Sequence, residues 1–293
     1  MTNKDWLRIV ALGFLWGSSF LYAEILLRYL NPLMIVFLRV GLAGLTLLVI
    51  CLMKRHRIKL TGNDLVNIGV MGALNNVIPF SLIVWGQQTT TGGLASIINA
   101  STAFFSILLA ALFIPQERLT WNRIAGVLIG VVGVAVAVGP ANMLQVSEND
   151  IGKYLILLAT ISYAFAGIWA KLRMQNLPSL ISATGMLVAS ALMMLPLLFV
   201  TDTFQASSID VYVFFLSFQF AVICSVFAYL LYFKILETTG AGNLLICTII
   251  VPPSAILLEV LVLDEVIGIS EFAGLLIVTV GMVVLDGRLL RRS

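Results

Sequence analysis

Charged residues are scarce in this chain. Asp, Glu, Lys and Arg make up 11% of its 293 residues and the mean hydropathy is +1.07, whereas a soluble domain carries roughly 25% charged residues. The sequence holds one His, in a basic loop, and three Cys, all within apolar segments. These residues offer neither the spacing of a metal site nor a disulfide framework. The composition excludes a protein that contacts only water, and it predicts an integral, all-α membrane protein without a metal or cofactor.

A catalytic set of side chains is also missing from the apolar segments. An intramembrane enzyme needs a catalytic set at membrane depth, such as paired acids or His ligands, and the sequence offers no such set. A receptor or scaffold is disfavoured because the connections are too short to hold a soluble domain. We therefore expect a protein that is not an enzyme, that lies in the lipid bilayer, that has a small-molecule substrate and that has no nucleic-acid partner.

Ten apolar segments account for most of the chain: about 6–27, 33–53, 65–87, 92–114, 121–139, 152–172, 179–200, 210–235, 241–263 and 271–287. Their lengths suit a bilayer, which takes about 20 residues to cross. If the N-terminus is cytoplasmic, 14 of the 17 Lys and Arg residues share its face: Lys4, Arg8, Lys54, Arg55, Arg57, Lys59, Arg118, Arg123, Lys171, Arg173, Lys234, Arg288, Arg291 and Arg292. Short loops rich in Lys and Arg stay in the cytoplasm. We expect both termini to be cytoplasmic and the protein to lie in the plasma membrane, the inner membrane if the source is a bacterium.

The chain contains an internal repeat. Thr90–Glu117 resembles Thr238–Glu265, since both begin with a Thr/Gly turn, continue as an apolar run and end on Glu. Each half, 1–140 and 151–288, then holds five segments. Five is an odd number, so the second unit is inverted relative to the first. Inverted repeats in transporters enclose a midplane site and support alternating access. A monomer is expected because the halves can be each other's partner, and a homodimer stays open.

Several short motifs follow one another in a fixed order: Leu15–Phe20, Pro32, Leu38-Arg39, Glu117–Thr120 and Gly126–Gly133, then Glu265, Gly274 and Gly281. Together they resemble the drug/metabolite transporter superfamily, in particular proteins with two EamA domains, such as bacterial amino-acid exporters similar to YddG. The resemblance covers nearly the whole chain, although Gly185 and Ser162-Tyr163 stand where Arg39 and Trp16-Gly17 would repeat. It implies a ten-helix basket whose central cavity is lined by helices 1, 3, 4, 6, 8 and 9.

Polar and aromatic residues at mid-depth of those helices are the candidate substrate-binding residues, because ligand sites combine apolar walls with a few polar groups. They are Trp16, Ser19, Tyr22, Asn75, Pro79, Phe80, Asn99, Thr102, Tyr163, Trp169, Tyr229 and Thr248. For any one of them, helix packing is an equally good interpretation. The Asn75-Asn76-x-x-Pro79 run is expected to loosen its helix.

Among the charged residues of the apolar segments, Glu24, Arg39 and Glu259 call for a reason. We expect Arg39 to form a structural ion pair with Glu24 or Glu259; a carboxylate anchor for substrate is the second interpretation. In small relatives of the superfamily a Glu of the first helix handles protons. Here Glu24 lies near the membrane surface, so a paired or solvated acid is favoured over proton coupling. Glu117, Glu265 and Pro252 are candidate gate or hinge residues, with a structural role favoured for both acids.

The leading hypothesis is a transporter that exports amino acids or similar small amphipathic metabolites by alternating access, either facilitative or by exchange. The alternative is a proton-coupled multidrug exporter of aromatic cations. That function would need an anionic cavity, for which Glu259 is the candidate.

Overall fold

The computed structural model describes residues 2–54, 60–139, 151–201, 203, 209–239 and 244–287, and within these ranges the chain is helical without a strand. The helices are α1 (Asn3–Leu26), α2 (Pro32–Met53), α3 (Gly62–Gly72), η1 (Ala73–Val77), α4 (Ile78–Gly86), α5 (Gly92–Asn99), α6 (Ser101–Phe113), α7 (Trp121–Val138), α9 (Ile151–Arg173), α10 (Ser179–Val200), α11 (Val211–Ala221), η4 (Val222–Phe227), α12 (Ala228–Thr239), α13 (Leu244–Leu263) and α14 (Ile269–Asp286). Ten spans are long and apolar enough to cross a membrane. The predicted integral membrane protein with ten helical spans is therefore confirmed.

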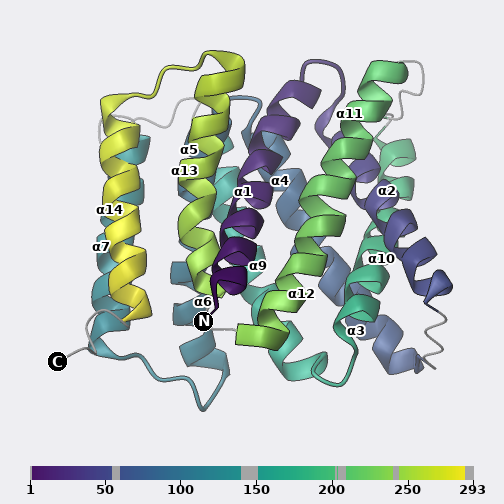
Figure 1. Ribbon diagram of the computed structural model, residues 1–293, viewed down its shortest axis with the longest axis horizontal. Coiled ribbons are helices and arrows are strands. Elements are labelled where there is room, and N and C mark those ends of the chain that lie inside the picture. Colours follow the sequence, from purple (N-terminus) through teal and green to yellow (C-terminus); the bar gives the residue numbers. More distant parts are fainter. Residues whose placement is uncertain are drawn as a thin grey trace.

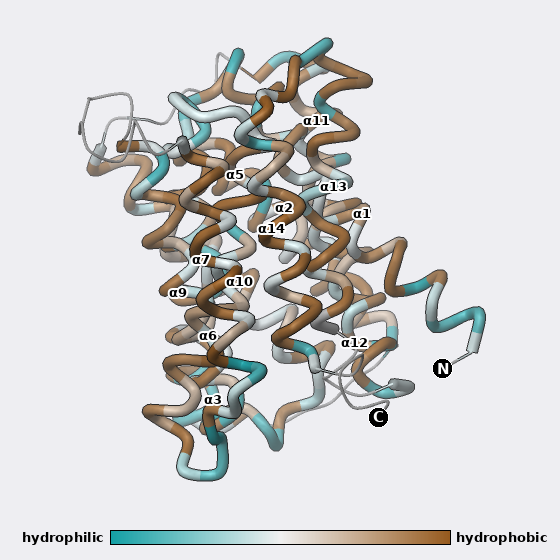
Figure 2. The backbone as a smooth tube through the Cα atoms, turned by 90° about the vertical axis from the view of Figure 1, so that its left-hand side faces the viewer, coloured by the Kyte–Doolittle hydropathy of each residue, from teal (hydrophilic) through white to brown (hydrophobic). Residues whose placement is uncertain are grey.

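The spans pack as pairs across the bundle (Figure 1). α7 packs on α14 at one edge and α2 packs on α10 at the other, while α1–α13 and α4–α9 lie between them. The start of α1 and the end of α14 lie at the same end of the bundle (Figure 1). Hydrophobic residues run along the helices, and hydrophilic residues gather at the two ends (Figure 2). The basic residues Arg55, Arg57, Lys59, Arg288, Arg291 and Arg292 lie outside the described part of the chain.

Helix starts follow local capping rules. Thr2 and Asp5 form a capping box at α1, and Thr61 and Asp64 form one at α3. The Asn31 side chain accepts a hydrogen bond from the Met34 N–H, and Pro32 takes the first position of α2. These side chains bind backbone N–H groups that have no partner in the first helical turn. The spans therefore begin where polar capping residues precede an apolar run.

Two spans contain a π-helical turn. Pro79 lacks an N–H group and cannot bond the carbonyl one turn earlier, and the π-helix η1 directly precedes it. The loosening predicted from Asn75-Asn76-x-x-Pro79 is confirmed. The second π-turn, η4, contains no proline and was not foreseen. By contrast, α13 remains α-helical through Pro252 and Pro253. Each π-turn contributes or adjoins polar residues of the cavity described below.

Glycines let α7 and α14 approach each other closely. A Cβ atom on Gly126 would lie 2.7 Å from the carbonyl oxygen of Gly281, and one on Gly281 would lie 2.6 Å from the backbone nitrogen of Gly130. Neither distance leaves room for a side chain, and small residues of this kind are common where membrane helices touch. The close packing predicted for Gly126-x-x-x-Gly130 is therefore present. The α7–α14 pair lies at the edge of the bundle, away from the cavity.

Candidate functional site

A cavity of about 660 Å³ lies between the two edges of the bundle. Its wall reaches from Gln87, at the end of α4, to Gln175 in the turn between α9 and α10 and to Ser179 at the start of α10. Gln175 is exposed, whereas Gln87 is only 6% exposed. The cavity therefore reaches the surface at the α9–α10 turn, here called the open end. It is sealed beyond Gln87, here called the closed end.

The cavity wall contains nine of the predicted substrate-binding residues, together with the hinge candidate Pro252: Trp16, Ser19, Asn75, Phe80, Asn99, Thr102, Tyr163, Tyr229 and Thr248. They come from α1, η1, α4, α5, α6, α9, α12 and α13. The structure thus brings residues from both halves of the chain to one site. Whether they bind substrate stays a prediction.

Tyr22, Pro79 and Trp169 are not part of the cavity wall. Helical residues are spaced by about 100°, so Tyr22 points about 120° away from Trp16. Trp169 has the same offset from Tyr163, and Pro79 lies about 100° from Phe80. The Tyr22 ring stacks on Phe220 at 5.7 Å between centroids, and the Trp169 Nε1 donates to the Asn67 carbonyl oxygen at 3.2 Å. The prediction that these three line the cavity is therefore wrong.

The contacts of the Arg39 side chain also differ from those predicted. Its Nε donates to Ser225 Oγ at 3.2 Å, and its guanidinium carbon lies 3.8 Å from the centroid of the Phe80 ring and 4.5 Å from that of Phe220. The expected ion pair with Glu24 or Glu259 is not formed. α2 was expected to lie outside the cavity, yet it contributes Arg39 to the wall. Aromatic faces attract a cation, and this is how the side chain is held without a carboxylate.

A hydrogen-bonded chain of polar groups borders the cavity beside η1. Asn75 Nδ2 donates to Tyr229 Oη at 3.1 Å, and the Tyr229 hydroxyl donates to Asn76 Oδ1 at 3.2 Å. Asn76 Nδ2 in turn donates to Ser190 Oγ at 3.0 Å. The chain fixes the Tyr229 ring at the wall, since a network whose members are all bonded holds its side chains rigidly.

Other polar atoms of the wall have no hydrogen-bond partner among the described residues. They are Gln87 Oε1 and, at the junction of α5 and α6, Asn99 Oδ1 and Thr102 Oγ1. Unpaired buried polar atoms carry a cost that a ligand's donors would remove. Sequence reasoning missed Gln87. Its spacing of seven residues from Phe80 on one helical face was the available signal.

The closed end holds two of the predicted acids, behind Gln87. Gly92 N–H donates to Glu24 Oε2 at 2.9 Å, and Gly93 N–H donates to Glu259 Oε2 at 2.7 Å. Neither acid lines the cavity. Glu265 follows α13 and lines a small pocket shared with Glu259 and Glu271. Glu24 and Glu259 thus lie in the part of the closed end that seals the cavity, and Glu265 lies on the outer side of that part.

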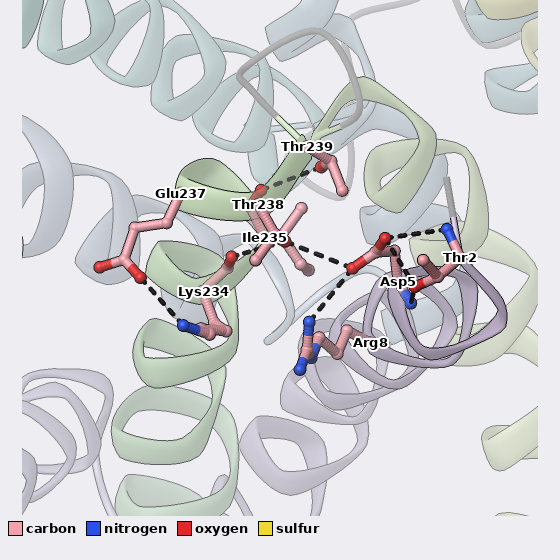
Figure 3. A network of polar contacts seen from close by, with 8 residues as sticks. All are labelled: Thr2, Asp5, Arg8, Lys234, Ile235, Glu237, Thr238 and Thr239. Carbon is pink, nitrogen blue, oxygen red and sulfur yellow. Dashed lines mark hydrogen bonds and ion pairs between the residues drawn. The ribbon is translucent and has the colours of Figure 1, made fainter.

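Two acids at the open end, Glu117 and Asp5, bind basic side chains. Glu117 accepts from Arg123 at 3.1 Å and from Lys171 at 2.7 Å. The hydrogen bond from Lys171, followed by that from Arg123, lowers the pKa of Glu117 below its usual value. Asp5 binds Arg8 at 3.1 Å and accepts from Thr238 Oγ1 at 3.3 Å, which links α1 to α12 (Figure 3). The gating role suggested for Glu117 and Glu265 stays a prediction.

Known proteins resemble the chain over its full length. The sequence profile of the EamA-like transporter family matches residues 6–139 and 150–285. An uncharacterized transporter from Archaeoglobus fulgidus is 22% identical over 279 residues, which cover 95% of this chain and 97% of that protein. The uncharacterized transporter YoaV of Bacillus subtilis (strain 168) is 21% identical over 287 residues, 95% of each chain.

Two further matches agree with these. The uncharacterized inner membrane transporter YedA of Escherichia coli (strain K12) is 26% identical over 189 residues, 64% of this chain and 60% of that protein. A solved crystal structure superposes over 100% of both chains with a TM-score of 0.73 at 16% identity, which shows a shared fold. With the family profile matched across both halves, this chain is a membrane transporter that belongs to the EamA-like transporter family of the drug/metabolite transporter superfamily.

Proposed function

We propose that this protein exports amino acids or similar small amphipathic metabolites by alternating access, either facilitatively or by exchange. Alternating access needs a central site that opens to one side at a time. The cavity is built from both halves of the chain, open at one end and sealed at the other, and this supports the mechanism. The direction of transport follows the resemblance to bacterial exporters.

The charge of the cavity is the observation that carries this proposal. Arg39 is the cation of the wall, and the described wall residues include neither Asp nor Glu. A buried guanidinium without a carboxylate partner favours a ligand that brings its own anionic group, because Arg matches carboxylates in charge and geometry. The aromatic rings of Trp16, Tyr163 and Tyr229 suit an apolar part of the same ligand. A small zwitterion with an apolar side chain combines both features.

The same observation weighs against the alternative, a proton-coupled multidrug exporter of aromatic cations. A cationic drug calls for an anionic wall, and the candidate for that role, Glu259, lies in the seal behind Gln87. Sugar phosphates also fit poorly, since several phosphate charges call for more than one Arg or Lys. Amphipathic monocarboxylates are therefore the substrates that the wall favours.

We further propose that the open end faces the cytoplasm, in a plasma membrane protein that acts as a monomer. Eight described basic residues come from the segments assigned to the cytoplasmic face: Lys4, Arg8, Lys54, Arg118, Arg123, Lys171, Arg173 and Lys234. The α9–α10 turn, where the cavity opens, follows Arg173 directly. Under the positive-inside rule this end is cytoplasmic.

Uptake into proteoliposomes of purified protein tests the function, with a panel of labelled amino acids, aromatic cations and sugar phosphates. We expect saturable amino-acid flux that needs no pH gradient and that falls at least about tenfold in Arg39→Gln, the loss of one charged hydrogen bond. Trp16→Ala should also reduce flux, whereas Trp121→Ala, at a side chain 86% exposed, is the matched control. Flux of cations alone, driven by a pH gradient, would replace this proposal with the alternative.

A further inference from the structure

Three spans meet at the closed end. α1 contributes Glu24, α13 contributes Glu259, and α5 begins at Gly92 with its N–H groups directed toward both carboxyls. A helix N-terminus favours negative charge. A Cβ atom on Gly92 would overlap Glu259 Oε1 and would lie 3.1 Å from Glu24 Oε2. The two carboxyls are therefore packed around the same glycine.

One oxygen of this pair lacks a partner. Glu259 is 2% exposed, and its Oε1 receives no hydrogen bond from any described donor. The carboxyls of Glu24 and Glu259 lie side by side: Glu259 Oε1 and Glu24 Oε2 are both within 3.1 Å of the Cβ position on Gly92, and the adjacent N–H groups of Gly92 and Gly93 bond one carboxyl each. Two carboxylates have no hydrogen to share, so in the ionised state this contact is repulsive. One proton between them turns the same contact into a hydrogen bond and satisfies Oε1.

No described Lys or Arg forms an ion pair with either carboxyl. Arg28, exposed just past α1, acts on Glu24 only at longer range, and Glu265 adds a further negative charge. The side-chain amide of Gln87 donates to the Phe20 carbonyl oxygen at 3.0 Å rather than to an acid. Among the described residues, the donors at this site are thus backbone N–H groups and not basic side chains.

A route for that proton leads to the surface. The small pocket beside the pair is lined by buried Glu259, by exposed Glu265 and by Glu271 of α14. It lies on the side of the pair away from the open end, since the cavity stops at Gln87. A proton released by the pair would pass to water in this pocket, and no other co-reactant would be needed.

We propose that Glu24 and Glu259 form a binding site for a single shared proton, and that this proton holds the closed end shut. Its loss leaves two adjacent carboxylates that repel each other, which separates α1 and α13 at the start of α5 and uncovers Gln87. The proposal adds a pH-dependent latch to the proposed transport cycle, and it does not require that a proton be carried with each substrate.

Infrared spectroscopy of the purified protein tests the site without any substrate. We expect the C=O band of one carboxylic acid near neutral pH, lost as the pH is raised. The band should disappear in Glu259→Gln and in Glu24→Gln, and it should persist in the controls Glu265→Gln and Glu271→Gln. A spectrum without this band, or a band that survives in both pair variants, would overturn the shared proton.

The latch has a separate readout. In a variant in which Cys51, Cys224 and Cys247 are replaced, the thiol of Gln87→Cys reports opening of the closed end. Any thiol reacts faster as the pH rises, because the thiolate is the reactive form, so the rate is expressed relative to that of free cysteine at the same pH. We expect this relative reactivity toward a water-soluble thiol reagent to rise severalfold with pH. In Glu24→Gln the amide N–H replaces the proton, so the relative reactivity should stay low at every pH. A pH-independent relative reactivity with Glu24 intact would contradict the latch, and failure of amino-acid transport would leave both results unaffected.

Discussion

The two ends of the bundle handle carboxylates in different ways. At the open end, Glu117 binds Arg123 and Lys171, and Asp5 binds Arg8 and the hydroxyl of Thr238. At the closed end, Glu24 and Glu259 accept hydrogen bonds from the backbone N–H groups of Gly92 and Gly93, and their carboxyls are packed around Gly92. Ion pairs with basic side chains keep their charge over a wide pH range, whereas a carboxyl pair changes its charge with one proton. The comparison indicates that the closed end is the part of the molecule built to respond to protons.

The largest expected effect comes from filling the space at Gly92. Gly92→Ala forces a methyl group into Glu259 Oε1, and overpacking of this kind costs about 1–3 kcal/mol. We expect a lower thermal unfolding midpoint in detergent and a closed end that reacts with thiol reagents at Gln87→Cys. Gly62→Ala is the matched control, because nothing lies within 4 Å of its added methyl group. Equal behaviour of the two variants would show that the closed end is not tightly packed.

A smaller effect is expected at the start of α1. Thr2→Ala removes the hydroxyl that accepts from the Asp5 N–H at 3.3 Å and donates to Asp5 Oδ2 at 2.8 Å (Figure 3). Loss of such a cap costs about 1 kcal/mol. Thermal unfolding should show this loss, while the pH dependence of Gln87→Cys reactivity should be unchanged. A changed pH profile would mean that the two ends are coupled more directly than their separate contacts indicate.

The pairing of Glu117 predicts a modest dependence of stability on pH. Its pKa is lowered in the folded protein by Lys171 and Arg123, so its contribution is present above the unfolded pKa of about 4.3. The contribution is lost as the pH falls through the lower folded value. Since the side chain is 30% exposed, we expect only a few tenths of a kcal/mol. Glu117→Gln should remove this acid-side dependence in pH-resolved thermal unfolding, and an unaltered profile would contradict it.

The smallest effect is expected for the exposed pair Lys234–Glu237. Its side chains are 53% and 63% exposed, and many ion pairs this exposed contribute nothing measurable to stability. Glu237→Gln should therefore leave the unfolding midpoint and transport nearly unchanged. A large loss of transport in this variant would show that the open end uses its surface charges for more than stability.

Hydropathy was sufficient to predict the ten spans, because a bilayer requires long apolar helices. Residue depth, together with the cavity helices that the family resemblance implies, was enough to select Trp16 and Tyr163 for the cavity. Tyr22 and Trp169 were misplaced because composition gives the depth of a residue, while the face it presents depends on the rotation of its helix. Along the same helices, the cavity residues Ser19, Phe20 and Ala23, and Gly167 and Ala170, define the correct face.

Arg39 and the carboxyl pair needed the tertiary structure. The position of Arg39 depends on Phe80 and Phe220, which lie in other spans, and no local pattern links them. Glu24 and Glu259 come from opposite halves of the chain and meet only because α1 packs on α13. η4 was missed for a related reason, since it contains no proline to mark it in the sequence.

Thiol reactivity at the two ends of the cavity tests alternating access most directly. Gln175→Cys reports the open end and Gln87→Cys the closed end, each in a variant without the native cysteines. Without substrate, we predict fast reaction at Gln175→Cys and slow reaction at Gln87→Cys. A transported amino acid should slow the first and speed the second, because opening of one end accompanies closing of the other. Two rates that do not change with substrate, or that rise together, would contradict a cavity that opens to one side at a time.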